Sequence, residues 1–333
     1  MVSVLSNTDI ILDAKERVLS GQKLDRESII GLLEIDPDSR DAELLGKAAR
    51  EVAGYVTGNR ASVWVSIGVD YRKCAMSCSF CSFGQKWGLV EQESERSTEE
   101  IIGLIDKFVS QGARWVTLRT TQFYGFDRLI QLIRDIRSSV SGDYEIVVNT
   151  GEFDDEKAMT LADAGAQMVY HTLRLREGTD TGFKPEERLA TLGCVKLSPL
   201  GLAYLVEPVG IEHTNEEIAD VFMKGMEHNA ILSGVMARVP LPGTPLADRA
   251  QISERRLAQI VAVTRLASGH QAPNICVHPP SPLAIQWGAN IVVVETGAIP
   301  RDTRDCDREW HEFDMNTAKD QFTSAGYTFF SGE

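Results

Sequence analysis

Long apolar runs are missing from this sequence. No stretch of about 18 or more uninterrupted apolar residues occurs, and the N-terminus, MVSVLSNTDIILDAKERVL, has no basic start followed by an apolar run. Neither a membrane span nor a signal peptide is therefore expected. We accordingly expect a cytoplasmic protein with no membrane partner.

Basic residues are also in short supply. Lys and Arg number 34 against 48 Asp and Glu, which gives a net charge of -14. Such a surface repels a phosphate backbone, and no Lys/Arg-rich stretch or interleaved aromatics offsets the repulsion. We therefore expect no nucleic-acid partner. The overall composition, 43% hydrophobic and 25% charged, is that of an ordinary globular protein.

Cysteine is the third scarce residue. Only six are present, and without an export signal they favour metal or redox use over a disulfide framework. Three of them, Cys74, Cys78 and Cys81, lie close together, whereas Cys194, Cys276 and Cys306 are scattered. The spacing predicts one site built on the first three.

Strand-like and helix-like segments alternate from residue 62 onward. Helical stretches lie between the strands, among them 97–112, where Ser97 and Glu100 form a predicted capping box. About eight β/α units are typical of a (β/α)8 TIM-type barrel of the α/β class, although periodicity alone would equally suit a doubly wound open sheet. The predicted strands cover 62–70, 114–120, 144–150, 166–174, 197–207, 231–240, 273–278 and 289–295.

Three regions follow from this pattern. Residues 1–58 are predicted to form a helical N-terminal extension, in which Asp25 and Ser39 start helices. Residues 59–300 are predicted to form the barrel, and 301–333 a short C-terminal tail packed on it. Both candidate folds place their ligands at the carboxyl ends of the strands, where we expect the functional side chains.

The three clustered cysteines suit an iron–sulfur site. Thiolates at this spacing, on a loop that leaves a strand, can converge on one face of a cube, and three ligands leave one iron open. A structural zinc site needs four closed ligands and usually shows paired CxxC units, but no second pair exists here. A zinc-stabilised binding protein and a simple electron carrier with a four-cysteine cluster remain the alternatives from another functional class.

The segment CAMSCSFC, residues 74–81, resembles the CxxxCxΦC signature of the radical S-adenosylmethionine (SAM) superfamily, with Phe80 at the aromatic position. The resemblance implies a 4Fe-4S cluster whose open iron binds SAM and cleaves it to methionine and a 5′-deoxyadenosyl radical. It also implies a small-molecule substrate and a reducing electron donor such as ferredoxin or flavodoxin. A barrel interior would shelter such a radical from water.

The resemblance extends over residues 60–299 and is greatest to the group containing biotin synthase, an iron-iron hydrogenase maturase similar to it, and methylornithine synthase. It is carried by residues 161–192, 234–248 and 278–295. By this resemblance Arg188 pairs with the SAM carboxylate, a role that suits a bidentate guanidinium. The cofactor-binding residues that the resemblance implies are Phe80, Thr120, Thr121, Gln122, Thr172, Arg174, Arg188 and Glu207.

Departures from the group narrow the expected reaction. Biotin synthase carries further cysteines on strands that here, at 114–120, 144–150 and 197–207, contain none. Standard biotin synthesis is therefore disfavoured. We expect hydrogenase-maturase-like or methylornithine-synthase-like chemistry in cofactor or unusual amino acid biosynthesis. Sulfur insertion like that of biotin synthase, without the usual auxiliary 2Fe-2S cluster, is the second choice.

Substrate contacts are expected at other strand ends. An arginine in methylornithine synthase that corresponds to Arg238 grips a substrate carboxylate, so an anionic, amino-acid-like substrate is implied. Cys276 and His278 share one face of a strand at period 2 and are the catalytic candidates. The expected substrate-binding residues are Arg238, His278 and Tyr124.

Overall fold

Eight parallel strands close into a barrel in the computed structural model, which describes residues 6–296 and 313–329. Closure occurs where the last strand pairs with the first, from Ser62 beside Ile291 to Ile67 beside Thr296. This confirms the (β/α)8 TIM-type barrel and excludes the open sheet. The barrel strands are β1 (Arg60–Gly68), β4 (Trp115–Arg119), β5 (Glu145–Asn149), β6 (Met168–Tyr170), β7 (Gly201–Val209), β8 (Ala230–Ala237), β9 (Asn274–His278) and β10 (Ile291–Thr296).

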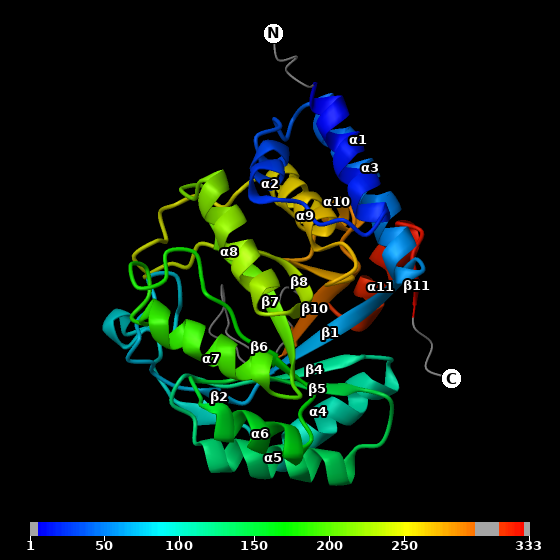
Figure 1. Cartoon of the computed structure of the whole chain (residues 1–333). Coiled ribbons are helices and arrows are strands. Elements are labelled where there is room, and N and C mark those ends of the chain that lie inside the picture. Colours follow the sequence, from blue (N-terminus) through cyan, green and yellow to red (C-terminus); the bar gives the residue numbers. More distant parts are fainter. Residues whose placement is uncertain (1–5, 297–312, 330–333) are drawn as a thin grey trace.

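Helices surround the barrel, and polar caps define where they begin (Figure 1). The predicted capping box of Ser97 and Glu100 is present at the start of α4, and Thr214 and Glu217 form another at α8. The outer helices are α4 (Thr98–Ser110), α5 (Phe126–Ser139), α6 (Asp155–Ala164), α7 (Pro185–Leu197), α8 (Asn215–Glu227), α9 (Glu254–Ser268) and α10 (Pro282–Gln286).

The N-terminal region is helical, as predicted, and packs on one side of the barrel. It comprises α1 (Asn7–Leu19), α2 (Arg26–Leu33) and α3 (Arg40–Thr57), with Asp25 and Ser39 as the expected N-caps. These helices lie against α8, α9 and α10 (Figure 1). Gly46 of α3 sits directly against the indole of Trp287, so the two segments approach closely. The exact boundary at residue 58 stays a prediction.

The C-terminal region contributes a helix and a ninth strand to the same body. Helix α11 (Met315–Ser324) contacts β1 and β10, and β11 (Thr328–Phe329) pairs with β1 at Arg60 and Ala61. A two-stranded ribbon, β2 (Asp70–Tyr71) and β3 (Ser94–Glu95), frames a loop that contains a short 3-10 helix, η1 (Gln85–Trp87).

Two strand boundaries differ most from the predicted ones. The strand predicted at 197–207 begins only at Gly201, because α7 continues to Leu197 and Pro199 then prevents further helix. The strand predicted at 166–174 ends at Tyr170, after which the chain leaves the sheet. In both stretches the alternation of apolar residues predicted a strand, but the backbone forms one over only part of the length.

Apolar side chains form two separate cores. The larger lies between the strands and the surrounding helices, whereas the smaller fills the lower part of the barrel interior. We call this second cluster the lumen plug. Among the described residues, no helix is both long and apolar enough to cross a membrane. The lumen plug consists of Trp64, Trp115, Val147, Met168, Ala203, Leu205, Leu232, Cys276 and Ile291.

Candidate active site

The three clustered cysteines lie on a tightly turned loop at the carboxyl end of β1. Backbone hydrogen bonds from Ser77 to the Cys74 carbonyl (3.3 Å) and from Cys81 to the Cys78 carbonyl (3.0 Å) fold the loop back on itself. Cys78 is buried, and the other two thiols are half-buried. Burial raises the pKa of Cys78 to about 12, and the neighbouring thiols of Cys81 and Cys74 add to the rise while Arg174 opposes it.

This geometry suits an iron–sulfur cluster held by three thiolates. Burial raises the pKa of the Cys74 and Cys78 thiols, and the neighbouring Cys81 adds to the rise at both, so these two thiols stay protonated until a metal replaces their protons. Backbone N–H groups of Met76, Gln122 and Ser77 hydrogen-bond the Cys74 sulfur and would support a thiolate there. Hydrogen bonds to sulfur also tune the potential of such clusters.

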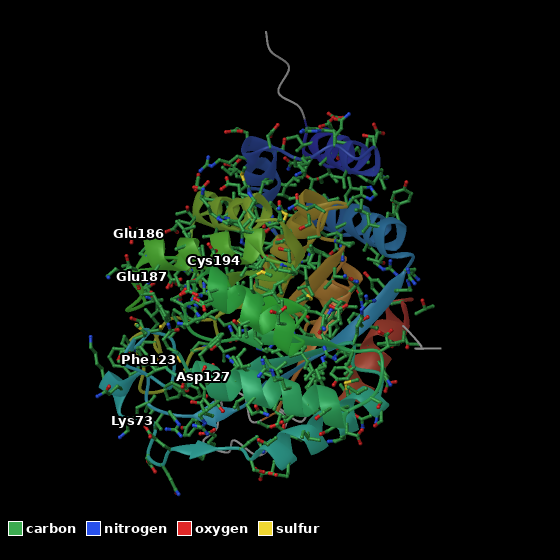
Figure 2. All side chains as sticks on the ribbon, turned by 60° about the horizontal axis from the view of Figure 1, so that its bottom comes forward. Lys73, Phe123, Asp127, Glu186, Glu187 and Cys194 are labelled. Carbon is green, nitrogen blue, oxygen red and sulfur yellow. The ribbon has the colours of Figure 1, made fainter. Side chains whose placement is uncertain are left out.

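Neither of the other two described cysteines can complete a four-thiolate site. Cys276 belongs to the lumen plug, where burial raises its pKa well above the usual range. Cys194 lies on the outer helix α7 (Figure 2). Cys306 falls outside the described residues. Within the described chain, the cysteine site is therefore one of three thiols, as a cluster with one open iron requires and a four-cysteine zinc site does not.

A cavity lies between the thiols and the barrel interior. It encloses about 750 Å³ of space outside the protein atoms, including space open to solvent. Cys78, Phe80 and Cys81 form one wall. Arg188 of α7 contributes to the lining, and the rest comes from the carboxyl ends of β4 to β8 and the loops that follow them: Arg119, Asn149, Tyr170, Thr172, Arg174, Glu207, Pro208, Met236, Arg238, Val239 and Leu241.

A second cavity, of about 360 Å³, continues toward the lumen plug. It shares four wall residues with the first, so the two form one path from the cysteine loop into the barrel. We call them the outer and the inner cavity. The inner cavity is lined by Trp64, Ser66, Thr117, Arg119, Asn149, Tyr170, Leu205, Met236, His278, Val293 and Glu295.

Arg188, which the resemblance pairs with SAM, is already held by protein groups. Its guanidinium donates to the Thr172 carbonyl at 2.7 and 3.1 Å and to the Glu152 carboxylate at 2.8 Å. Glu177 lies 3.4 Å away. Arg174 similarly lies 3.6 Å from Glu207. The buried Arg188 and the half-buried Arg174 are therefore held in place at the cavity wall before any ligand binds.

Arg238, the expected substrate anchor, is paired with Glu212 from the loop after β7. Both terminal nitrogens of Arg238 bond this carboxylate, while its buried Nε has no hydrogen-bond partner among the described residues. Gly210 makes this arrangement possible, since a Cβ at that position would overlap the guanidinium. The charge of Arg238 is thus balanced by a protein carboxylate, and one N–H remains unused.

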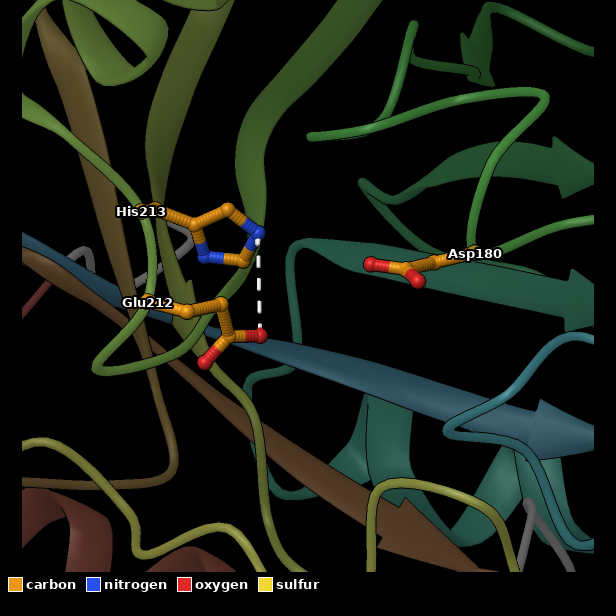
Figure 3. A group of neighbouring side chains, drawn as sticks. All are labelled: Asp180, Glu212 and His213. Carbon is orange, nitrogen blue, oxygen red and sulfur yellow. Dashed lines mark ion pairs between the residues drawn. The ribbon is translucent and has the colours of Figure 1, made fainter.

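Asp180, Glu212 and His213 come together beside this pair and have the donor types of a metal site (Figure 3). Two contacts argue against a metal. The Gly210 N–H donates to Nδ1 of His213 at 2.8 Å, so the neutral imidazole carries its proton on Nε2, the atom that faces Glu212. Burial lowers the pKa of His213, which keeps the ring neutral. Glu212 is also engaged by Arg238, so the group is better described as part of an ion-paired network.

Several predicted site residues lie outside both cavities. Tyr124 donates to Glu95 at 3.0 Å on the outer ribbon, and burial raises its pKa to about 12. Thr121 bonds the buried Asp70 through its N–H and hydroxyl, which ties the loop after β4 to the cysteine loop. Thr120 contacts Thr150, and Gln122 contributes its backbone to Cys74. Cys276 lies below both cavities, in the lumen plug.

Among the wall residues missed from the sequence are Arg119, Asn149, Tyr170 and Glu295. Arg119 bonds Glu295 at 3.1 Å, and His278 lies 3.6 Å from the same carboxylate. Tyr170 donates its hydroxyl to Glu207. A signal was available, since each is a polar residue within or at the end of an otherwise apolar predicted strand.

Comparisons with known proteins agree with this geometry. The model of the Radical SAM superfamily matches residues 69–174. The chain is 27% identical over 282 residues to biotin synthase of Persephonella marina, covering 80% of this chain and 81% of that protein. Its fold is similar to that of methylornithine synthase (PylB), with a TM-score of 0.78, 18% identity and coverage of 95% and 96% of the two chains. It also resembles HydG, a maturase of the FeFe-hydrogenase, with a TM-score of 0.81, 14% identity and coverage of 97% and 76%.

Proposed function

Since the chain belongs to the radical SAM superfamily, we propose that it acts on a small, anionic, amino-acid-like molecule in the biosynthesis of a cofactor or an unusual amino acid. The observation that carries the proposal is the placement of the cysteine loop, through Cys78 and Cys81, at one wall of a cavity whose other walls include several charged side chains. With a 4Fe-4S cluster and SAM bound, the site is supplied with a 5′-deoxyadenosyl radical.

Cys74, Cys78 and Cys81 hold the cluster in this proposal, and the outer cavity receives SAM. Arg188 and Arg174 present fixed positive charge to its carboxylate, while Thr172 and Glu207 offer hydroxyl and carboxylate oxygens to its polar groups. Phe80 covers one side with an aromatic ring. The loop of Thr120, Thr121 and Gln122 acts indirectly, because its contacts position the cysteine loop.

Substrate occupies the inner cavity and the adjoining part of the outer one. Arg238 supplies the unused N–H at its Nε, and His278, at the end of the neighbouring strand β9, lines the inner cavity beside Glu295. Pro208, Val239 and Leu241 add apolar lining that would limit the access of water to the reacting atoms once ligands fill the cavity. A low-potential electron donor such as ferredoxin or flavodoxin completes the proposed system. The hydroxyl of Tyr124 already donates to Glu95, so we assign it no substrate contact.

Sulfur insertion is the second candidate, and the similarity to biotin synthase favours it. That reaction needs a sulfur source in the barrel. β4, β5 and β7 carry no cysteine, and Cys276 of β9 is packed among apolar side chains. We therefore place this reaction below hydrogen abstraction or addition on an amino-acid-like substrate.

The test is anaerobic reconstitution with iron and sulfide, followed by dithionite and SAM, with chromatography of 5′-deoxyadenosine. Wild-type protein is expected to bind about four irons and to release 5′-deoxyadenosine, whereas Cys78→Ala should do neither. Cys194→Ala is the matched control, because it removes a thiol on the outer helix α7, and should behave as wild type.

Other outcomes identify the rival functions. A firmly bound cluster without SAM cleavage would point to an electron carrier. Bound zinc in place of iron would indicate a zinc-stabilised binding protein. Either result would overturn the proposal.

A further inference from the structure

We propose that Arg119 and Asn149 form a binding site for the α-amino-acid head group of the substrate, at the junction of the outer and inner cavities. The inference rests on the proposed function and goes beyond it by naming the group recognised and the residues that recognise it. Neither residue belongs to the site predicted from the sequence, and both line both cavities.

This position lies near the closed end of the path that leads from the cysteine loop into the barrel. Beyond it the inner cavity ends at the lumen plug, which contains Trp64 and Trp115 and closes the barrel. Above it the outer cavity leads to the cysteine loop. A substrate that enters from that side therefore meets the polar strand ends with its leading group and cannot extend past the plug. Polar recognition at this depth fixes which atoms of the ligand face the cysteines.

The Arg119 guanidinium has N–H donors that no described residue accepts from. Its Nη1 donates to Glu295 at 3.1 Å, and this is the single hydrogen bond from its guanidinium within the described chain. The Nε and Nη2 groups therefore remain for a ligand. Two parallel N–H donors match the two oxygens of a carboxylate. Arg238 cannot offer the same fork, because both of its terminal nitrogens are taken by Glu212.

Asn149 supplies an acceptor beside these donors. Its side-chain nitrogen donates to the Tyr170 carbonyl at 2.9 Å, which fixes the orientation of the amide. Its Oδ1 makes no hydrogen bond to any described residue and belongs to a side chain on the cavity wall. Asn149 is the register neighbour of Arg119 in the sheet, so the two Cα atoms are about one strand spacing, roughly 5 Å, apart.

Charge balance favours a zwitterion over an ion of either sign. Arg119 is already compensated by Glu295, so a head group with a net charge of its own would be poorly balanced at this position, whatever charge the rest of the ligand carries. An α-amino acid brings its own balance. Its carboxylate accepts from Arg119, while its ammonium donates to Oδ1 of Asn149. A neutral amide could use the same partners, but it would leave the charged fork of Arg119 without a matching anion.

Calorimetric titration of the iron-loaded, SAM-bound protein tests this assignment. The probes are the common L-α-amino acids and, for each that binds, the amine formed by decarboxylation. At least one amino acid should bind, and its amine should bind about tenfold or more weakly because the charge-assisted bonds to Arg119 are lost. Arg119→Met should weaken binding of the amino acid and leave binding of the amine unchanged, so the two affinities should become similar. Asn149→Leu should weaken both ligands.

Controls separate recognition from structural damage. Arg26→Met removes an arginine from a surface ion pair with Asp220 and should leave both affinities unchanged. Arg119→Lys keeps the charge without the fork and substitutes for Arg119→Met if that variant does not fold. Equal weakening of acid and amine by the Arg119 variants would overturn the inference, because it indicates a structural role.

The outcome is distinguishable from failure of the proposed function. Wild-type protein that loads iron and cleaves SAM but binds none of the amino acids overturns the head-group assignment alone. Protein that neither loads iron nor cleaves SAM overturns the proposed function, and the inference falls with it.

Discussion

Buried charge at the cavity wall determines the protonation of His171. The ring is fully enclosed, with Nε2 3.3 Å from the Glu152 carboxylate, and Arg188 approaches the same carboxylate. Burial and, after it, the positive charge of Arg188 lower the pKa of His171 to about 4, against the opposing effect of Glu152. The imidazole is therefore neutral at physiological pH, and the Glu152 carboxylate forms its ion pair with Arg188.

This single residue predicts a pH dependence of stability. The unfolded chain takes up a proton at His171 below about pH 6.5, whereas the folded protein does so only near pH 4. Stability is therefore lost as the pH falls through this window. Between pH 7 and pH 5 we expect the free energy of unfolding to drop by about 2 kcal/mol from this group. Urea unfolding at a series of pH values measures it.

Replacement of the imidazole isolates the effect. His171→Gln should flatten the fall in stability between pH 7 and pH 5, whatever its effect on stability at neutral pH. His270→Gln, at an exposed histidine, should leave the slope as in wild type. An unchanged slope in the His171 variant would assign the pH dependence to other groups.

At the scale of elements, the packing of α3 against the end of α10 requires a residue without a side chain, Gly46. A Cβ on Gly46 would overlap the indole ring of the buried Trp287, whose ring cannot swing aside as a flexible side chain could. We expect Gly46→Ala to lower the free energy of unfolding by about 1–3 kcal/mol, the usual effect of overpacking. Thermal or urea unfolding measures the change.

Gly103→Ala is the matched control. Gly103 also lies inside a helix, α4, but a Cβ there would meet no heavy atom within 4 Å. Alanine restricts the unfolded chain and favours the helix, so stability should rise by about 0.5–1 kcal/mol. Two substitutions of the same chemistry should thus act in opposite directions. Equal effects would show that α3 does not pack against Trp287 as described.

At the scale of the whole molecule, the cysteine loop is tied to distant parts of the chain. The Ser79 N–H donates to the Asp180 carbonyl at 2.7 Å, and the Leu246 N–H donates to the Ser79 carbonyl at 3.1 Å. The loops after β6 and β8 therefore meet on the cysteine loop. The N-terminal helices lie on the far side of α9 and share none of these contacts.

Iron loading should consequently stabilise one end of the barrel. We expect hydrogen exchange, followed by mass spectrometry, to slow by about tenfold or more at residues 72–87, 176–183 and 241–249 when the protein is reconstituted. Residues 40–57 of α3 should exchange at the same rate with and without iron. Similar slowing in α3 would mean that iron acts on global folding, not on the loops that meet the cysteines.

Much of the architecture and the metal site was determined locally, by the sequence alone. The eight strands appear as short apolar runs, and helix starts such as Ser97 and Ser39 are marked by caps, because period and capping depend on neighbours in the chain. The cysteine motif can be read just as locally, since all three cysteines lie within the short segment 74–81. Where strand ends were misplaced, as at Gly201, an alternating apolar pattern competed with a helix that tertiary packing extended.

Only the tertiary structure decided which charges face the ligand. Barrel closure brings Arg119 of β4 to Glu295 of β10 at 3.1 Å, across 176 positions of sequence. It also pairs Arg238 with Glu212, so that the expected carboxylate anchor is occupied, and it buries Cys276 in the lumen plug. No local pattern contains these facts, because the side chains that balance a buried charge come from whichever strands the fold makes neighbours.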